Sequence, residues 1–258
     1  FDIESGKIKW QTKFNYNITG TPEIKGDTAY FGTGEYGFTA IGLNSGTELW
    51  SFKNSSAHVE SKPLISGGKI YFTAWDGYLY ALERSSGKML WKWSEEKPNF
   101  YYAPAACNPV LIDGKILLTA PNKFITLISS DSGKTIWRSN QHPSWESIGI
   151  SVTGDRFYVK GLTDTLFCYE LKNDTPELLW YNVLGYGFET SPIPIIEHGG
   201  SVYVPAGNGF LYTVDAKTGK FKRSYFLGES IMNSPLILED GTIIVSNMDG
   251  VIRRIRYK

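Results

Sequence analysis

The chain has 258 residues, and its 26 Lys and Arg residues balance 26 Asp and Glu residues, so its formal net charge at neutral pH is zero. This balance argues against a nucleic-acid or anionic-membrane partner, because phosphate binding needs a net basic face. No apolar run reaches the roughly 18 residues that a membrane-spanning helix requires, so no membrane span is predicted.

One phrase recurs along the chain: a turn that ends in Gly, then three residues, then Trp. The clear copies are DIESGKIKW (2–10), GLNSGTELW (42–50), ERSSGKMLW (83–91) and SSDSGKTIW (129–137). Two degenerate copies follow, LKNDTPELLW (171–180) with Pro176 in place of Gly and DAKTGKFKR (215–223) with Arg223 in place of Trp. Successive copies are 40 to 46 residues apart. Internal repeats of about this length are typical of propeller blades.

Between these phrases, each repeat contains further short strands. An inner strand opens after a small or polar residue followed by Pro, as in Thr21-Pro22, Lys62-Pro63, Asn108-Pro109, Ser191-Pro192 and Ser234-Pro235, with Ser147-Ile148 at the equivalent place. A second strand follows a tight turn, as in GGKIYFTA (67–74) and GGSVYVPA (199–206), and a third leads to the Gly turn, as in DGYLYALE (76–83). Four short strands joined by Gly-bearing turns predict an antiparallel meander.

The two ends of the chain complement each other in this pattern. Residues 234–257 supply three predicted strands of a blade, and residues 1–12 have the pattern of the missing outer strand. A blade short of one strand leaves unpaired backbone groups at its edge, which the N-terminal segment can pair. We therefore predict an all-β fold, a six-bladed β-propeller of four-stranded antiparallel blades, as a single domain over residues 1–258. The chain opens with Phe1, so we expect an upstream segment or domain in a longer protein.

The repeat resembles the pyrroloquinoline-quinone (PQQ) type, Ala-x-Asp-x-x-x-Gly-x-x-x-Trp followed by Ser-Pro. The matching residues are Ala40, Gly46 and Trp50; Ala81, Gly87 and Trp91; Asp2, Gly6 and Trp10; Asp215 and Gly219; Ser191-Pro192 and Ser234-Pro235. The superfamily includes quinoprotein alcohol dehydrogenases and the propeller lipoprotein of the outer-membrane β-barrel assembly machine. The resemblance implies an extracytoplasmic location, in the periplasm or at the cell surface.

A regularly spaced aromatic residue is more often core than ligand site, and in this family the repeated Trp packs between neighbouring blades. We therefore assign a packing role to Trp10, Trp50, Trp91, Trp137 and Trp180.

Cofactor binding is not expected. The resemblance to quinoproteins would imply an adjacent Cys-Cys pair and a calcium site of Glu, Asn and Asp, but Cys107 and Cys168 stand far apart in the sequence. PQQ and calcium are therefore not expected as cofactors, and we interpret both thiols as buried and inert. The three histidines, His58, His142 and His198, show no ligand spacing, and no metal site is predicted.

The candidate site lies in the loops that lead from each outer strand to the next inner strand, at the predicted channel mouth. Glu60, Glu146 and Glu189 fall just before inner-strand starts, so we expect them at one rim. Other predicted site residues are Lys62, Asn108 and Asn233, with the aromatic residues Tyr101, Tyr102, Trp145 and Tyr186; Phe188 lies in the same loops. Together they predict a polar and aromatic surface for a sugar, a peptide or a partner loop. For any single residue, the alternative is a solvated Glu or local loop packing.

These features favour a non-catalytic binding or scaffold propeller for a protein or glycan partner, accessory to an upstream domain. The alternative is a carbohydrate-active enzyme whose channel-mouth carboxylates act as acid and base, which would require a pair about 5–10 Å apart. A PQQ-dependent dehydrogenase is the least favoured interpretation. The sequence does not identify the ligand.

Overall fold

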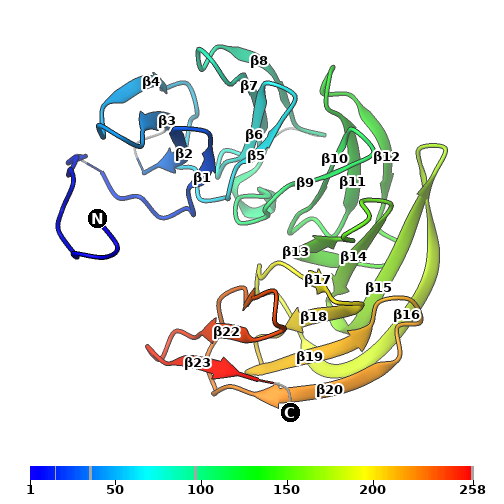
Figure 1. The fold of residues 1–258 in the computed structure, drawn as a ribbon. Helices are drawn as coiled ribbons and strands as arrows, with labels where there is room; N and C mark the ends of the chain where they lie inside the picture. Colours follow the sequence, from blue (N-terminus) through cyan, green and yellow to red (C-terminus); the bar gives the residue numbers. More distant parts are fainter. Residues whose placement is uncertain (15, 35–36, 96–97, 257–258) are drawn as a thin grey trace. The chain divides into compact units, whose positions relative to one another are not determined.

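The computed structural model describes residues 1–14, 16–34, 37–95 and 98–256. These residues form six antiparallel sheets, five with four strands and one with three, which confirms the predicted all-β class. The chain divides into two compact units, Phe1–Pro109 and Val110–Lys258 (Figure 1). The organisation of the whole chain as one domain stays a prediction.

The first unit contains two four-stranded sheets whose strands follow one another in chain order. The first sheet comprises β1 (Glu23–Lys25), β2 (Thr28–Thr33), β3 (Gly37–Gly42) and β4 (Glu48–Phe52). The second comprises β5 (Leu64–Ser66), β6 (Lys69–Thr73), β7 (Leu79–Glu83) and β8 (Met89–Trp93), and a short 3-10 helix, η1 (Phe100–Tyr102), comes after it. Both sheets are the meanders that the Gly-bearing turns predict.

The middle strands of these sheets are buried on both faces. Consecutive residues of β6 and β7 are buried, and Phe72 stacks between Phe38 and Tyr80 with ring centroids 4.4 and 5.3 Å away. The outer strands β4 and β8 leave Leu49 and Met89 exposed. Sheets covered on both faces need apolar residues in succession, which explains the continuous apolar runs in the sequence.

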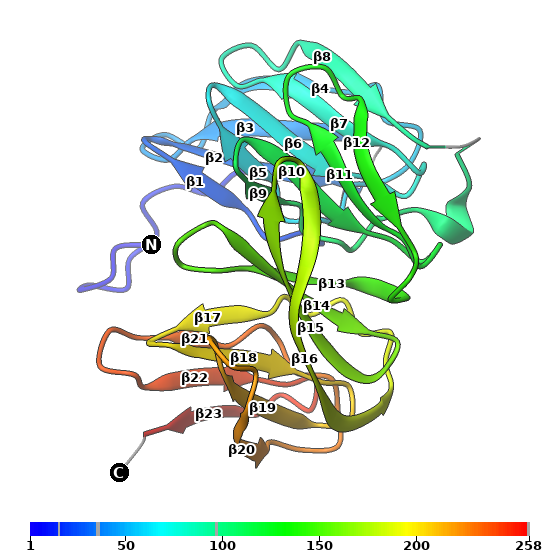
Figure 2. The same ribbon diagram turned by 90° about the vertical axis from the view of Figure 1, so that its right-hand side faces the viewer.

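The second unit contains three four-stranded sheets and one three-stranded sheet (Figure 2). Its strands are β9 (Val110–Ile112), β10 (Lys115–Thr119), β11 (Ile125–Ser129) and β12 (Thr135–Ser139); β13 (Ser144–Ile150), β14 (Arg156–Gly161), β15 (Thr163–Lys172) and β16 (Thr175–Phe188); β17 (Ile196–His198), β18 (Ser201–Pro205), β19 (Phe210–Asp215) and β20 (Phe221–Phe226); and β21 (Leu236–Ile237), β22 (Ile243–Ser246) and β23 (Ile252–Ile255).

A long hairpin, β15–β16, occurs where the repeat lacks its usual Gly. Asn173 and Asp174 join the two strands with φ angles of 48° and 66°. Two consecutive left-handed residues match a two-residue hairpin turn, and Asn and Asp tolerate this conformation. The degenerate copy of the repeat therefore forms a different type of turn, which still connects two antiparallel strands. β16 continues to Phe188, so residues 185–188 are strand rather than the loop that we predicted.

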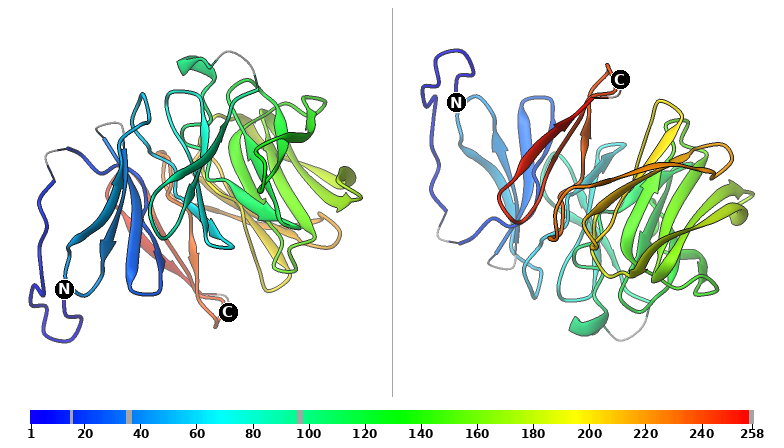
Figure 3. Two further views of the ribbon diagram at one scale, coloured as in Figure 1. Left: turned by 90° about the horizontal axis from the view of Figure 1, so that it is seen from above. Right: turned by 90° about the horizontal axis from the view of Figure 1, so that it is seen from below.

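The last sheet has three strands, and the predicted fourth strand from residues 1–12 is absent from it. Residues 1–14 contain no strand (Figure 3). They keep only the turn of the repeat, in which the Asp2 N–H donates to Lys7 O and the Gly6 N–H donates to Asp2 O, both at 2.8 Å. In the four-stranded sheets each outer strand pairs with the strand before its turn, whereas residues 1–14 pair with no strand of any sheet. Residue 257, the end of the predicted segment, lies outside the described residues.

The predicted packing role of the repeated Trp is confirmed where its ring covers a Gly of the next repeat. Trp10 covers Gly46, and Trp180 covers Gly219; a Cβ on either glycine would lie 2.3 or 2.4 Å from the ring. Two residues after these Trp residues, Thr12 Oγ1 and Asn182 Nδ2 donate to the carbonyl of the same glycine, at 2.5 and 2.6 Å. Each pair thereby connects two successive repeats.

Candidate partner-binding surface

Two predicted site residues of the first unit join neighbouring segments of the chain. The backbone N–H of Lys62 donates to Asn108 Oδ1 at 2.8 Å, and Lys62 Nζ lies 2.8 Å from Glu23 Oε2. Asn108 thereby links the start of β5 to the end of the first unit. Both side chains already have partners within the fold.

Exposed aromatic side chains surround η1. Phe100, Tyr101 and Tyr102 are 55%, 80% and 57% exposed. Trp75 packs against Phe100 with ring centroids 4.9 Å apart, and His58 lies 5.7 Å from Trp75 on the same measure. We call these five residues the η1 surface. Exposed aromatic residues this close together are uncommon outside interaction sites.

Local backbone contacts hold η1 in place. Asn99 caps the helix, and its side chain accepts a hydrogen bond from the Tyr101 N–H at 2.9 Å. Gly77, with φ of 86°, lets the chain pass so closely that a Cβ there would lie 3.1 Å from Pro98 Cβ. The turn that carries Trp75 therefore positions η1, because any other residue at Gly77 would push Pro98 away.

Glu60 supports this surface. Trp75 Nε1 donates to Glu60 Oε2 at 2.9 Å, and the Trp75 backbone N–H donates to His58 O at 3.1 Å. The carboxylate thus fixes the indole that Phe100 covers. Of the predicted site residues, the structure brings Glu60, Tyr101 and Tyr102 into one area, joined through Trp75 and Phe100.

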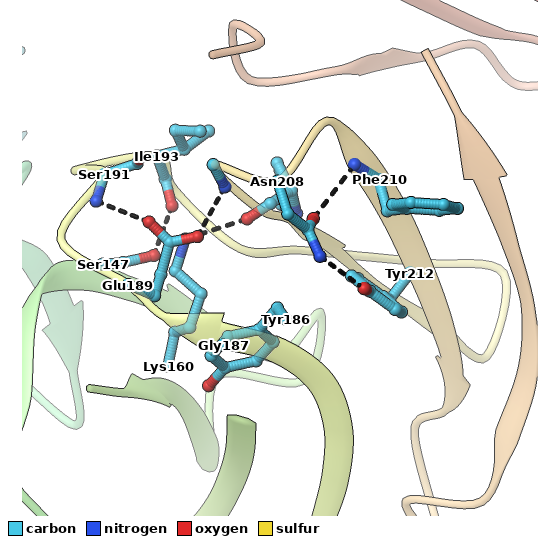
Figure 4. Close-up of polar contacts among 12 residues, drawn as sticks. Ser147, Lys160, Tyr186, Gly187, Glu189, Ser191, Ile193, Asn208, Phe210 and Tyr212 are labelled. Atoms are coloured by element: carbon cyan, nitrogen blue, oxygen red, sulfur yellow. Dashed lines mark hydrogen bonds and ion pairs between the residues drawn. The ribbon is translucent and has the colours of Figure 1, made fainter. Parts of the chain in front are cut away.

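In the second unit, the predicted rim residue Glu189 lies in the interior beside Lys160 (Figure 4). Lys160 Nζ is 3.5 Å from Glu189 Oε2 and donates to Pro205 O at 2.9 Å. Backbone N–H groups of Ser191 and Gly207 donate to the two carboxylate oxygens at 2.6 and 2.5 Å. Desolvation by burial lowers the pKa of Lys160, although the nearby Glu189 charge opposes this shift. The arrangement ties the end of β16 to the loop after β18.

The other predicted residues of the second unit do not form one exposed surface. Glu146 and Tyr186 are buried, Trp145 is half-buried, and Asn233 is exposed and donates through Nδ2 to Ser246 Oγ at 2.8 Å. The Tyr186 hydroxyl donates to backbone carbonyls, including that of Thr165 at 2.6 Å, and burial raises its pKa. Glu146, Tyr186 and Glu189 therefore do not project from the surface as expected: Glu146 is buried within β13, and the end of β16 and the loop after it turn Tyr186 and Glu189 inward.

Sequence reasoning missed His58, Trp75 and Phe100 in the first unit and Lys160 in the second. Trp75 carried a usable signal, since it stands outside the Gly-x-x-x-Trp phrase and had no packing role to fill. Lys160 gave none, because an isolated Lys at the end of a strand pattern is usually solvent-exposed.

The two thiols are free and buried, as predicted, and burial raises the pKa of Cys168 to about 12. Among the described residues, no group of three or more His, Cys, Asp or Glu side chains is arranged to hold a metal ion. The described part of the chain also holds no helix of the length and apolar character needed to cross a membrane.

The model of the family described as outer membrane protein assembly factor BamB matches residues 1–110 and 121–222. The chain belongs to this family. The BamB of Legionella pneumophila (strain Paris) is 27% identical over 115 residues, which cover 40% of this chain and 29% of that protein. The match thus spans less than a third of that relative.

Solved structures show the same fold. BamB from Moraxella catarrhalis superposes with a TM-score of 0.74 at 15% identity, over 97% of this chain and 73% of that one. Quinohemoprotein alcohol dehydrogenase from Comamonas testosteroni gives a TM-score of 0.66 at 17% identity, over 82% of this chain and 43% of that one. The predicted PQQ-like β-propeller is confirmed. At these identities the structural likeness concerns the fold alone.

Proposed function

We propose that the chain is a non-catalytic propeller that works outside the cytoplasm and binds a protein partner through the η1 surface. One observation supports this most directly: three consecutive aromatic side chains of one short helix are each more than half exposed. Aromatic residues are enriched at the energetic centres of protein interfaces. The family description, an assembly factor for outer membrane proteins, supports both the location and a protein partner.

The η1 surface suits a preformed interface. Trp75 and Glu60 hold its base, and the Asn99 cap fixes the backbone of the helix. A partner that covers Phe100, Tyr101 and Tyr102 would bury apolar area with little ordering of the chain, which lowers the entropic cost of binding. The rings alone could also stack on a sugar, so a glycan is the alternative occupant that the experiment must separate.

Several contacts argue against the carbohydrate-active alternative. Acid and base catalysis on a sugar would need two carboxylates free to reach one substrate. Glu60 accepts the Trp75 indole N–H, and both oxygens of Glu189 accept backbone N–H groups in the interior. Glu146 is buried as well. These carboxylates have positioning partners within the fold, which favours a binding role.

Site-specific cross-linking tests this proposal. A photoreactive phenylalanine analogue replaces Tyr101 in the full-length protein in its native host, and the same analogue replaces Leu49, an exposed residue of the same unit. We expect a protein adduct at position 101. The adduct at position 49 should be at least about fivefold weaker, as for a localised interface. Phe100→Ala should reduce the adduct at position 101, because it removes the neighbouring ring.

Two results would contradict the proposal. One is an adduct pattern that does not distinguish position 101 from position 49. The other is capture of glycans on an array by the wild-type chain, lost in Tyr101→Ala, without any protein adduct. Circular dichroism of each variant checks folding, which should be unchanged because exposed substitutions usually alter stability by only about 0.5 kcal/mol.

A further inference from the structure

A separate pocket of about 280 Å³ lies in the second unit. Four segments form it: the β10–β11 turn, the loop before β13, the β14–β15 turn and the end of β16. Its lining residues include Lys123, His142, Leu162, Phe167 and Phe188. The volume is just below the roughly 300–1,000 Å³ typical of small-molecule sites, so it suits a ligand with a single ring.

The walls of this pocket include three rings, those of His142, Phe167 and Phe188. The imidazole of His142 stacks on Phe167 with ring centroids 4.3 Å apart and 20° between the planes, and its Nδ1 contacts the Tyr169 hydroxyl. Phe188 also lines the pocket and is 75% exposed. Aromatic side chains prefer offset-stacked or edge-to-face contacts with further rings, so an inserted ring would find matching partners here.

The backbone around the pocket is held by hydrogen bonds. The Leu162 N–H donates to Pro143 O and the Glu189 N–H donates to Leu162 O, both at 2.9 Å. Asp164, with φ of 52°, accepts the Gly187 N–H at 2.5 Å through Oδ1. These bonds fix the β14–β15 turn against the end of β16, so the backbone that carries Phe188 is held in place before a ligand arrives.

Lys123 gives the pocket a positive charge. Its side chain is exposed, it makes no ion pair with another described residue, and its φ of 71° places it in the left-handed region. A non-glycine residue in this conformation carries a backbone cost that often marks functional positions. Apart from the titratable His142, Lys123 is the only charged residue among those that line the pocket. Its ammonium group is unpaired within the described part of the chain.

We infer that this pocket binds an aromatic carboxylate, with the ring between Phe167 and Phe188 and the carboxylate on Lys123 Nζ. The ligand class follows from charge complementarity and from the aromatic walls. A terminal or side-chain carboxylate next to an aromatic group of a peptide presents this chemistry, as does a small aromatic acid. The inference does not depend on the η1 surface, because no residue is shared between the two sites.

Binding of N-acetyl-L-phenylalanine to the full chain tests the inference, with N-acetyl-L-phenylalaninamide as the uncharged probe. Two-dimensional NMR titration of the backbone amides would follow both. We expect the acid to shift the signals of Phe167 and Phe188 with a Kd of about 1 mM, in keeping with the size of the probe. The amide should bind at least about threefold more weakly than the acid, since it lacks the contact with Lys123.

Matched variants separate the two contacts. Lys123→Asn, chosen because Asn tolerates positive φ, should weaken the acid about threefold and leave the amide unchanged. Its control is Lys134→Asn, an exposed lysine in the β11–β12 turn. Phe188→Ala should weaken both probes about fivefold or more, whereas Phe221→Ala, at another exposed phenylalanine, should not.

Several outcomes would overturn the inference. They are shifts spread over the chain without concentration at the pocket, equal affinity for the acid and the amide, or unchanged acid binding in Lys123→Asn or Phe188→Ala. Loss of cross-linking at position 101 with intact binding of the acid would reject the proposed function and leave this site standing.

Discussion

The indole of Trp50 covers Gly87 so closely that a Cβ on this glycine would lie 2.4 Å from Trp50 Cε3. Trp50 Nε1 also donates to Arg84 O at 3.0 Å, in the turn that contains Gly87. Gly87 has φ of 71°, so the position excludes a side chain by conformation as well as by contact. The Gly and the Trp of the repeat therefore belong to a single contact between successive sheets.

This contact predicts a large cost for a single methyl group. Gly87→Ala should lower the free energy of unfolding by about 2–4 kcal/mol, because it combines left-handed strain with displacement of the indole. Gly67→Ala is the control, since Gly67 also has positive φ, 55°, but open space around its Cβ position. It should cost only the conformational part, about 1 kcal/mol. Equal midpoints for the two variants in urea unfolding would refute the role of Trp50.

The buried Lys160–Glu189 pair predicts that loss of a buried charge lowers the free energy of unfolding far more than loss of an exposed charge. Glu189→Gln leaves Lys160 in the interior without a counter-charge, so we expect a loss of about 3 kcal/mol or more in unfolding free energy. The same change at Glu177, which pairs with Lys172 at the surface, should cost about 0.5 kcal/mol or less. Urea unfolding of both variants measures the difference, and a mild effect at Glu189 would mean that water reaches Lys160.

Lys160 also predicts a dependence of stability on alkaline pH. Burial lowers its folded-state pKa to about 8, from an ordinary value of 10.5. Between these values the unfolded chain binds a proton that the folded chain does not, so the free energy of unfolding should rise with pH. Wild type should thus gain stability relative to Lys160→Met between about pH 7.5 and about pH 9.5, as measured by urea unfolding. Parallel curves for the two proteins would exclude this titration.

His142 predicts the corresponding effect in acid. Burial lowers the pKa of this imidazole below its usual 6.5. In the window below 6.5 the unfolded chain binds more protons, so stability falls as the pH is lowered towards the folded-state pKa. Wild type should therefore lose more stability than His142→Gln on acidification from about pH 7 to about pH 5. Thermal unfolding at both pH values checks this, and an equal loss in the variant would assign the acid sensitivity to other groups.

The contact between Trp75 and Glu60 can be isolated by a double-mutant cycle. Trp75→Phe removes the indole N–H and keeps most of the ring, and Glu60→Ala removes the acceptor. We expect a coupling energy of about 1 kcal/mol from urea unfolding, as for a typical hydrogen bond to a charged group in a half-buried place. A coupling near zero would mean that Glu60 does not position Trp75, and that the η1 surface is held by ring packing alone.

The repeat predicted the sheets well because each copy contains the residues that specify its own turns and strands. Positive φ at Gly46, Gly87 and Gly219 places the turns, and the Trp residues identify the outer strands. The prediction failed for residues 1–12, where the turn forms without a strand, since strand pairing depends on a neighbour that the local pattern does not specify. It also missed that Asn173 and Asp174 replace the Gly turn and extend β16.

The candidate site was harder to predict, because exposure depends on how loops fold over the sheets. All four of these residues were predicted in loops of similar composition, but Tyr101 and Tyr102 are exposed whereas Tyr186 and Glu189 are buried. The difference lies in partners that are remote in the sequence, such as Lys160 and the Gly207 N–H for Glu189. Spacing within one repeat contains no information about these partners.

Trp10 packs on Gly46, and Trp10 Nε1 donates to Leu43 O at 2.5 Å. This contact determines where the chain can be truncated. A truncation boundary should not be placed between two sheets, because side chains from the preceding segment complete the packing of the first strand-forming repeat. A fragment that starts at β1 would leave Leu43 and the apolar cluster around Phe31 open to solvent. Useful fragments should retain the tryptophan of the preceding repeat together with the two residues after it.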